Sequence, residues 1–438
     1  MATQLIDHAV PLIRALVIHP ERSGFGASES SRQSTERLEE AVGLARALDL
    51  DVRGEEIVRV RKPAPATLFG SGKVEELAAL VRAAEAEAVV VDDDLSPVQQ
   101  RNLEKAWDCK VIDRTGLILE IFGRRARTKE GRLQVELARL DYERSRLVRT
   151  WTHLERQRGG TGSTGGPGET QIELDRRLIA DRIVKLKAEL EEVRRTRGLH
   201  RKQRQKVPFP TVALVGYTNA GKSTLFNRLT GSEVLAKDLL FATLDTTQRT
   251  IRLPQGRPAI VADTVGFISD LPHELVESFR ATLEEVGEAD LILHVRDIAS
   301  PDSDAQRKDV EAVLEQIETP EGKTRRVLEV WNKIDLLDDE TREAVLGQAE
   351  RLQAQGEAVA VSAWTGEGIE LLRETIASLI DDDPETELVL DPSQGEALAW
   401  LYENGRVTGR ETDDEGRTHV VVRLHPAALG RFERQFGV

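Results

Sequence analysis

One eight-residue segment, GYTNAGKS at 216–223, constrains the fold more than any other part of the chain. It follows an apolar run at 210–215 and precedes an amphipathic stretch, so it predicts a strand, a phosphate-binding loop and a helix. Glycines permit the turn that aims backbone N–H groups and a helix N-terminus at phosphates, while Lys222 adds a cation and Ser223 can ligate Mg²⁺. We expect the whole loop to contact nucleotide: Gly216, Tyr217, Thr218, Asn219, Ala220, Gly221, Lys222 and Ser223.

Three later motifs follow in a set order, each at the end of an apolar run. The first is DTVG, after the run at 258–262, in which Asp263 can hold Mg²⁺ through water and the Gly266 N–H can sense the terminal phosphate of the nucleotide. Its four predicted contact residues are Asp263, Thr264, Val265 and Gly266.

The second and third motifs indicate which base is bound. In NKID the Asp335 carboxylate can accept two hydrogen bonds from guanine, a pair of donors that adenine lacks, and SAW would close over the base. NKID alone is often an ordinary polar tetrapeptide after a strand, but four motifs in this order at strand ends make that explanation poor. The predicted base-site residues are Asn332, Lys333, Ile334, Asp335, Ser362, Ala363 and Trp364.

The 438 residues are too many for one core, and the first quarter alternates apolar runs with helical patterns. This predicts an N-terminal parallel α/β domain over 1–123. Its GSGK at 70–73 resembles a phosphate loop weakly, and a turn into a helix at Val74 explains it better.

The segment 124–206 changes period. A heptad pattern begins here and returns after a glycine-rich stretch, which predicts a long antiparallel helical hairpin with arms of about 30 residues, on the order of 45 Å. Its positions are Leu133, Leu137, Leu140, Leu147, Trp151 and Leu154 in the first arm and Ile172, Ile179, Ile183, Leu186, Leu190 and Val193 in the second. Its tip is the glycine-rich loop 159–168, which we interpret as backbone exposed to a ligand or RNA rather than a plain connector.

Charge distinguishes this hairpin from the rest of the chain. It carries 23 lysines and arginines against 12 acidic residues, an excess of eleven positive charges. Because the whole chain has a net charge of −15, the rest of the chain carries −26. A basic block on an acidic body suits RNA docking, although a solvated, salt-bridged helix pair explains the charge equally well.

The remaining sequence limits the class of protein. The single Cys109 cannot form an internal disulfide, no Cys/His cluster indicates zinc, and no apolar run is long enough to span a membrane. We therefore expect a soluble, cytoplasmic monomer. A G domain over 207–382 and a small C-terminal α+β domain over 383–438 complete the predicted α/β multidomain architecture.

The chain resembles the HflX family of translation-factor-type GTPases over nearly its whole length. Three segments outside the phosphate-loop domain carry the resemblance: VIDRTGLILEIF at 111–122, RTKEGRLQVELA at 127–138 and GPGETQIELDRR at 166–177. The resemblance implies a Ras-like G domain and a GTP-reading switch at Phe241, Ala242, Thr243, Leu244 and Asp245.

In that implied scheme Thr243 is the second protein ligand to Mg²⁺, and the catalytic residues are Lys222, Thr243 and Gly266. By chemistry alone Thr246 or Thr247 would serve as well as Thr243. The resemblance further implies binding to the large ribosomal subunit and its rRNA, and splitting or rescue of stalled ribosomes. The alternative is a nucleotide-gated RNA-binding module in which hydrolysis is incidental.

Several positions depart from expected patterns. Thr246 stands where the family has proline, and the tip loop lacks the arginine expected between its glycines. Phe267 follows Gly266 where many G domains place a water-orienting glutamine, so intrinsic hydrolysis should be slow. Asn219 matches the asparagine with which some G domains hold K⁺, and an asparagine that merely caps or supports the loop explains it equally well.

Overall fold

The computed structural model describes twelve stretches of the chain: 12–22, 34–157, 167–204, 209–232, 240–241, 246–254, 258–269, 286–317, 326–380, 384–413, 416–424 and 426–437. They form two compact units. The first holds residues up to 194 together with 240–241 and 268–269, and the second holds the rest.

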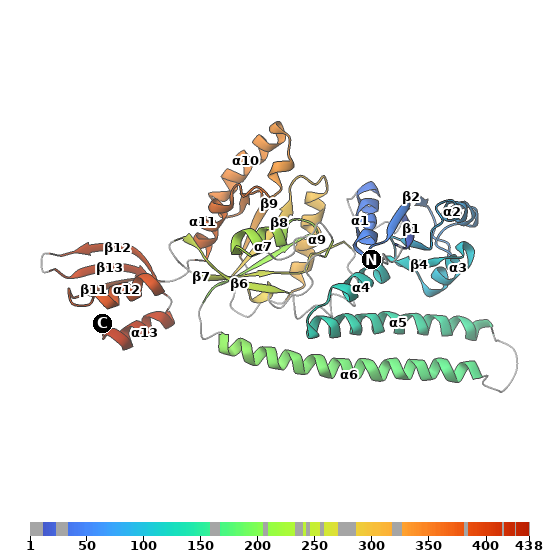
Figure 1. The fold of residues 1–438 in the computed structure, drawn as a ribbon, viewed down its shortest axis with the longest axis horizontal. Helices are drawn as coiled ribbons and strands as arrows, with labels where there is room; N and C mark the ends of the chain where they lie inside the picture. The colour runs from blue at the N-terminus through green and yellow to red at the C-terminus, as the bar shows by residue number, and fades with distance from the viewer. Residues whose placement is uncertain are drawn as a thin grey trace, which may run out of the picture. The chain divides into compact units, whose positions relative to one another are not determined.

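The N-terminal part of the first unit is a parallel sheet covered by helices, as predicted (Figure 1). Its strand order is β2-β1-β3-β4. The strands are β1 (Arg14–Arg22), β2 (Asp51–Val60), β3 (Ala88–Val91) and β4 (Lys110–Asp113), and the helices are α1 (Ser34–Ala47), α2 (Ser71–Ala83), α3 (Pro97–Trp107) and α4 (Arg114–Arg125). Gly70 is the N-cap of α2, so GSGK begins a helix.

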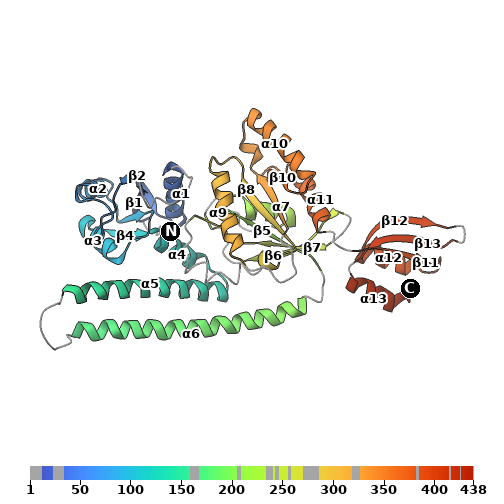
Figure 2. The ribbon, with the colours of Figure 1, turned by 180° about the vertical axis from the view of Figure 1, so that it is seen from behind.

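Two long helices run antiparallel beside each other, as the views in Figures 1 and 2 agree. They are α5 (Lys129–Gln157) and α6 (Pro167–Arg204). Their seam buries leucines and isoleucines at the predicted heptad positions: Leu133, Leu137, Ile183, Leu186 and Leu190. The predicted positions Leu147, Trp151, Leu154 and Ile172 lie outside the described side chains.

The hairpin differs from the prediction in two respects. With 38 residues, α6 is about 57 Å long, so the arms are unequal. It also begins at Pro167, inside the predicted tip loop 159–168, because proline is well suited to the first position of a helix. The rest of that loop, through 166, lies outside the described residues.

The second unit contains a six-stranded sheet of order β10-β9-β8-β5-β7-β6, parallel except for β6. The strands are β5 (Thr211–Gly216), β6 (Thr247–Arg252), β7 (Pro258–Asp263), β8 (Leu291–Asp297), β9 (Val327–Asn332) and β10 (Ala358–Ala360). The helices are α7 (Lys222–Thr230), α9 (Ser303–Glu315), α10 (Asp339–Gln353) and α11 (Ile369–Leu379), and a 3₁₀ turn, η2, spans Ile334–Leu336. The sheet places every predicted nucleotide motif at the carboxyl ends of its strands.

The C-terminal residues of the second unit form the predicted small α+β fold, with an antiparallel sheet of order β11-β13-β12. Its elements are β11 (Glu385–Leu390), α12 (Gly395–Asn404), β12 (Arg406–Thr412), β13 (Thr418–Arg423) and α13 (Pro426–Phe436). Trp400 on α12 packs against Phe432 on α13 with ring centroids 5.5 Å apart. The sequence patterns did not predict β12 or α13.

Within the described part of the chain, no helix combines the length and the apolar character that crossing a bilayer requires.

Candidate guanine-nucleotide site

The loop between β5 and α7 depends on two glycines. Gly216 has φ +151°, and a Cβ there would lie 2.2 Å from the Val295 carbonyl oxygen. Gly221 has φ +92°, and a Cβ there would lie 2.2 Å from Asn332 Nδ2. Neither position has room for a side chain, so glycine is required at both for the loop to pass this close to Val295 and Asn332.

Lys222 begins α7 and is buried. Its Nζ donates a hydrogen bond of 2.7 Å to the Tyr217 carbonyl across the loop. Burial lowers the pKa of this lysine to about 8, against an opposing effect of Asp263. An added phosphate would favour the charged form of the ammonium, because a nearby anion raises a lysine pKa.

Ser223 and Asp263 bring two oxygen atoms together below the loop. The Ser223 hydroxyl donates to Asp263 Oδ2 at 2.8 Å, and Asp263 is fully buried at the end of β7. Mg²⁺ prefers oxygen ligands and keeps several waters, so a hydroxyl with a neighbouring carboxylate fits it. Thr243, the other predicted ligand, lies in 242–245, outside the described residues.

The segment after Asp263 crosses directly over the loop. Thr264 Oγ1 donates to the Leu214 carbonyl at 2.6 Å. A Cβ on Gly266 would lie 2.9 Å from Thr218 Cγ2 and 3.2 Å from Lys222 Nζ, so only glycine fits there without displacing the loop. The backbone of Gly266 is therefore beside the lysine that is predicted to contact the outer phosphates.

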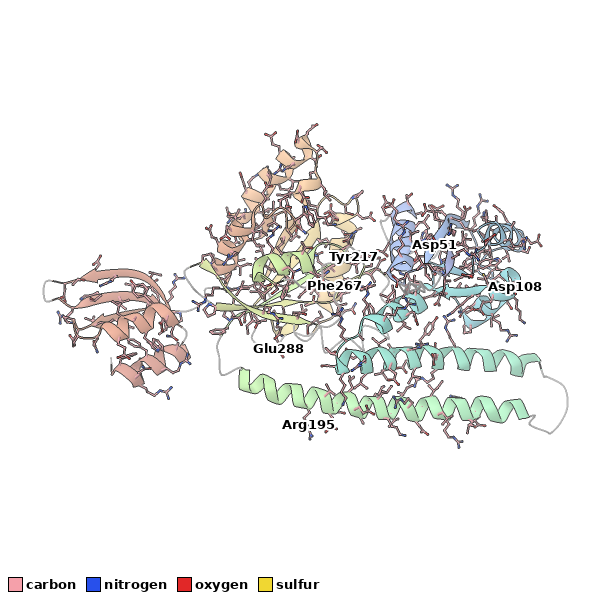
Figure 3. All side chains as sticks on the ribbon, in the orientation of Figure 1. Asp51, Asp108, Arg195, Tyr217, Phe267 and Glu288 are labelled. Atoms are coloured by element: carbon pink, nitrogen blue, oxygen red, sulfur yellow. The ribbon has the colours of Figure 1, made fainter. Side chains whose placement is uncertain are left out.

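Phe267 joins the same arrangement through its backbone. Its N–H donates to the Gly216 carbonyl at 3.1 Å, and its own carbonyl accepts the Thr218 N–H at 2.7 Å. Figure 3 shows Tyr217 and Phe267 close together, where they form a parallel bridge. The Phe267 side chain is 3 % exposed, so it is a packing group and supplies no hydrogen bond to water.

Asn332 ties the base motifs to the phosphate loop. Its Nδ2 donates to the Ala220 carbonyl at 2.8 Å, and its Oδ1 accepts the Ala363 N–H at 2.9 Å. Lys333, with φ +68°, pairs with Asp297 at 2.7 Å. Ile334 is buried, which anchors the NKID loop. Ser362 Oγ accepts the Thr365 N–H, which holds the turn that follows SAW.

Asp335 is exposed, and among the described residues none donates a hydrogen bond to its carboxylate. Trp364 is 78 % exposed in the adjacent loop. The structure thus leaves an acceptor carboxylate and an aromatic ring at the surface, on the side where the predicted guanine would bind.

Arg228, near the end of α7, was not among the predicted site residues. Its Nε donates to the Ala363 carbonyl at 3.2 Å, and its Nη2 donates to the Trp364 carbonyl. It therefore links the helix of the phosphate loop to the base loop. No motif marked this arginine, because its partners lie some 135 residues later in the chain.

Phe241, the first residue of the predicted switch, and Ser269, which no sequence motif marked, both pack within the first unit. Phe241 is 2 % exposed and meets the Phe122 ring edge-on at 4.6 Å between centroids, and its carbonyl accepts from Arg125 Nη1 at 3.3 Å. Ser269 accepts from Arg114 Nη2 through its carbonyl at 2.9 Å and its hydroxyl at 3.0 Å. Of the predicted switch 241–245, only Phe241 is described.

Arg114 lies at the centre of a buried charge cluster. It contacts Asp92 and Glu40, each at 2.5 Å, and Asp92 also contacts His19 Nδ1 at 2.9 Å. Burial would raise the pKa of Asp92, but Arg114 and His19 outweigh it and hold that pKa at about 2. The sequence signal for Arg114 was its place in the VIDRTGLILEIF segment.

The phosphate loop, the DTVG crossing and the coupled base loops on a mostly parallel sheet define a P-loop GTPase. Four family models together span most of the chain: "GTP-binding GTPase N-terminal" at 35–123, "GTP-binding GTPase Middle Region" at 125–204, "50S ribosome-binding GTPase" at 211–333 and "HflX C-terminal domain" at 347–438.

Curated relatives agree with these models. The chain is 51 % identical over 405 residues to "GTPase HflX" of Magnetococcus marinus, covering 92 % of this chain and 91 % of that protein. It is 46 % identical over 365 residues to "GTPase HflX" of Escherichia coli, covering 83 % and 84 %. The chain belongs to the HflX family of GTPases.

Removing the Arg114 guanidinium should strongly destabilise the N-terminal fold. Arg114→Ala leaves Asp92 and Glu40 buried without their cation, a loss of roughly 3–5 kcal/mol. Chemical denaturation at pH 7 measures it. Arg59→Ala, which breaks an exposed pair with Glu21, is the control and should change stability by less than about 1 kcal/mol.

The pH dependence gives this prediction a second readout. The pKa of Asp92 in the folded chain lies below its ordinary value of 3.8, so its contribution is present above that value and is lost as pH falls toward 2. The stability difference between wild type and Arg114→Ala should therefore shrink over that range. Equal stability of the two proteins at pH 7 would contradict the assignment.

Arg228→Ala should weaken guanine-nucleotide binding about 10- to 100-fold, because two carbonyls of the base loop lose a charged donor. Titration with a fluorescent GDP analogue measures the change. Arg342→Ala, which removes only an exposed pair with Glu367 in the same region, is the matched control. Unchanged affinity in Arg228→Ala would mean that the link does not organise the base loop.

Proposed function

We propose that the chain is a GTP-hydrolysing switch that acts on the large ribosomal subunit, in splitting or rescue of stalled ribosomes. The observation that carries the nucleotide part is Asn332, which joins the phosphate loop to the base loop while Asp335 stays exposed as an acceptor. The working parts are the predicted ones: an N-terminal domain (1–123), a basic hairpin (124–206), a G domain (207–382) and a C-terminal appendage (383–438).

In this proposal, separate groups of site residues bind the phosphates and the base. Backbone N–H groups of 216–223 and the Lys222 ammonium bind the phosphates, and Gly266 donates its N–H to the γ-phosphate. Asn332 and Asp335 orient guanine, while Ser362, Ala363 and Trp364 close over it. The switch at 241–245 responds to the γ-phosphate.

Ser223 and Thr243 would hold Mg²⁺, with Asp263 acting through water. When bound, this ion neutralises charge on the β- and γ-phosphates. The chain itself positions the phosphates by Lys222 and the loop, but Phe267 is buried and provides no group that orients the attacking water. A bound partner must complete that part of the site.

The hairpin is the proposed ribosome-binding element. Its exposed side chains on α6 include Arg176, Arg177, Lys185 and Lys187, none of which has a partner among the described residues. Cations that have no partner in the described part of the hairpin favour binding to rRNA phosphates over internal salt bridging. The "50S ribosome-binding GTPase" model that matches 211–333 agrees with a ribosomal partner.

Binding to purified large subunits should fall steeply as salt rises, because cations that meet phosphates release counterions. Sedimentation with a non-hydrolysable GTP analogue measures the binding. The triple reversal Arg176→Glu, Arg177→Glu and Lys185→Glu should weaken binding and flatten its salt dependence.

The matched control reverses three exposed basic residues of the second unit, Lys308, Arg351 and Arg431, which should leave the salt dependence unchanged. Binding that is insensitive both to salt and to the hairpin reversals would leave the hairpin as a solvated surface. Loss of binding in the control triple alone would move the docking surface to the second unit.

Asn219 is the proposed K⁺ ligand. It is exposed in the loop and has φ +60°. Asparagine adopts this left-handed conformation more readily than most residues, so backbone geometry alone also accounts for it. A comparison of K⁺ with Na⁺ decides between the two explanations.

A further inference from the structure

A groove of about 810 Å³ lies in the G domain between α9 and α10. Its floor is formed by β8, β9 and β10, and none of the described residues that line it is a predicted nucleotide-site residue. The volume falls within the range of ligand-binding clefts. No step of GTP binding or hydrolysis described above uses it.

The floor carries polar side chains where a sheet covered by helices normally buries apolar ones. His294 and Arg296 point to this side of β8, and Glu329 and Trp331 to the same side of β9. Arg296 is held by Glu329 at 2.7 Å and by Asp304 at 2.6 Å, and the Trp331 indole donates to Glu329 at 2.7 Å.

His294 is only 2 % exposed and lines the groove without any hydrogen bond to its ring from the described residues. Burial lowers its pKa to about 4, so the imidazole is neutral at pH 7. A neutral buried imidazole without a partner carries a desolvation cost, which a ligand group can offset by hydrogen bonding to it.

The walls combine apolar and acidic groups. Leu314, Val345 and Leu352 line the sides, while Glu315 and Glu357 have no cationic partner among the described residues. Among the described residues, the lining holds two arginines, Arg296 and Arg307, against five carboxylates: Asp304, Glu311, Glu315, Glu329 and Glu357. The described lining is therefore net acidic, which disfavours a phosphate backbone.

Its length suits an extended chain better than a small molecule. The lining runs along α9 from Asp304 to Glu315, which is roughly 16 Å at 1.5 Å per residue. An extended peptide rises about 3.3 Å per residue, so about five residues span the groove. Alternating side chains would then meet the apolar walls and the carboxylates in turn.

We propose that this groove binds a short extended segment of a partner protein in which basic and apolar residues alternate. Lysine or arginine heads of the segment pair with Glu315 and Glu357, and their apolar neighbours contact Leu314 and Leu352. The surface differs in charge from the basic hairpin, so the inference stands apart from the proposed rRNA docking.

The test uses the full chain and the labelled peptide acetyl-Lys-Leu-Lys-Leu-Lys-amide, followed by fluorescence anisotropy. We expect saturable one-to-one binding below about 1 mM, and none with the Glu-Leu-Glu-Leu-Glu counterpart. Glu315→Gln with Glu357→Gln should weaken binding about tenfold, because two exposed charge pairs are lost. The matched control, Glu340→Gln with Glu343→Gln on α10, removes the same charge from exposed positions outside the lining.

A second variant, Val345→Trp, fills the groove and should abolish binding while guanine-nucleotide affinity, the check on folding, stays unchanged. Absence of saturable peptide binding would overturn the proposal, as would equal loss in the control pair. Equally tight binding of free spermine, competing with the peptide, would also overturn it and make the groove a small-amine site.

Discussion

Large ribosomal subunits should raise GTP turnover by this chain by roughly 10³–10⁵-fold, the range in which a partner-supplied group accelerates other G domains. The structural reason is Phe267. Its side chain is buried and its backbone is tied to Gly216 and Thr218, so the residue after the DTVG glycine does not orient water. Release of phosphate, with and without purified large subunits, measures the effect.

Three controls make the result specific. Small subunits should not stimulate, and Lys222→Ala should remove activity with either subunit, because the phosphates lose their cation. The assay in K⁺ and Na⁺, repeated with Asn219→Ala, tests the K⁺ proposal separately. Fast hydrolysis by the chain alone in Na⁺ would contradict partner dependence, and subunit binding without stimulation would favour the RNA-binding alternative.

The parts of this fold that could be predicted are those in which local sequence determines local structure. The GYTNAGKS loop between an apolar run and a helix is the clearest case, since Gly216 and Gly221 have positive φ values and no room for a Cβ. The parallel N-terminal sheet and the seam of α5 and α6 follow from apolar periodicity in the same way.

The parts that could not be predicted depend on contacts between distant residues. Arg114 meets Ser269 across 155 positions, and Arg228 meets Ala363 across 135. Arg114 lies in the VIDRTGLILEIF segment and Arg228 in the amphipathic stretch after the phosphate loop, but neither local sequence predicts these partners. Arg114 matters because it is buried among carboxylates, whereas Arg228 is exposed and matters through its two carbonyl partners. Only the tertiary structure reveals either environment.

The strand β12 in the C-terminal fold could not be predicted for a different reason. β12 contains Gly409 and few apolar residues, and its register with β13 shifts between Val407 and Gly409. Such an edge strand has little period-two signal. Pairing with β13, rather than its own sequence, makes it a strand.

Asp335→Asn should change the base that the site accepts. The Asp335 carboxylate is exposed and accepts no hydrogen bond from the described residues, so it is free to accept guanine's N1–H and exocyclic amine. An asparagine presents an amide donor toward the same edge, which suits the carbonyl of xanthine. Loss of two hydrogen bonds to a charged acceptor corresponds to roughly 3–6 kcal/mol, or about 10²–10⁴ in GTP affinity.

Competition between GTP and xanthosine triphosphate for a fluorescent nucleotide, in wild type and variant, measures this change. The rest of the site should keep its geometry, because Asn332 still links Ala220 to Ala363 and Ile334 remains buried beneath the loop. Asp338→Asn is the matched control, since that carboxylate caps α10 through the Thr341 N–H and has no predicted contact with the base. If Asp335→Asn still prefers GTP, the carboxylate does not read the base, whereas equal weakening of both nucleotides would mean that the substitution disturbs the loop rather than its selectivity.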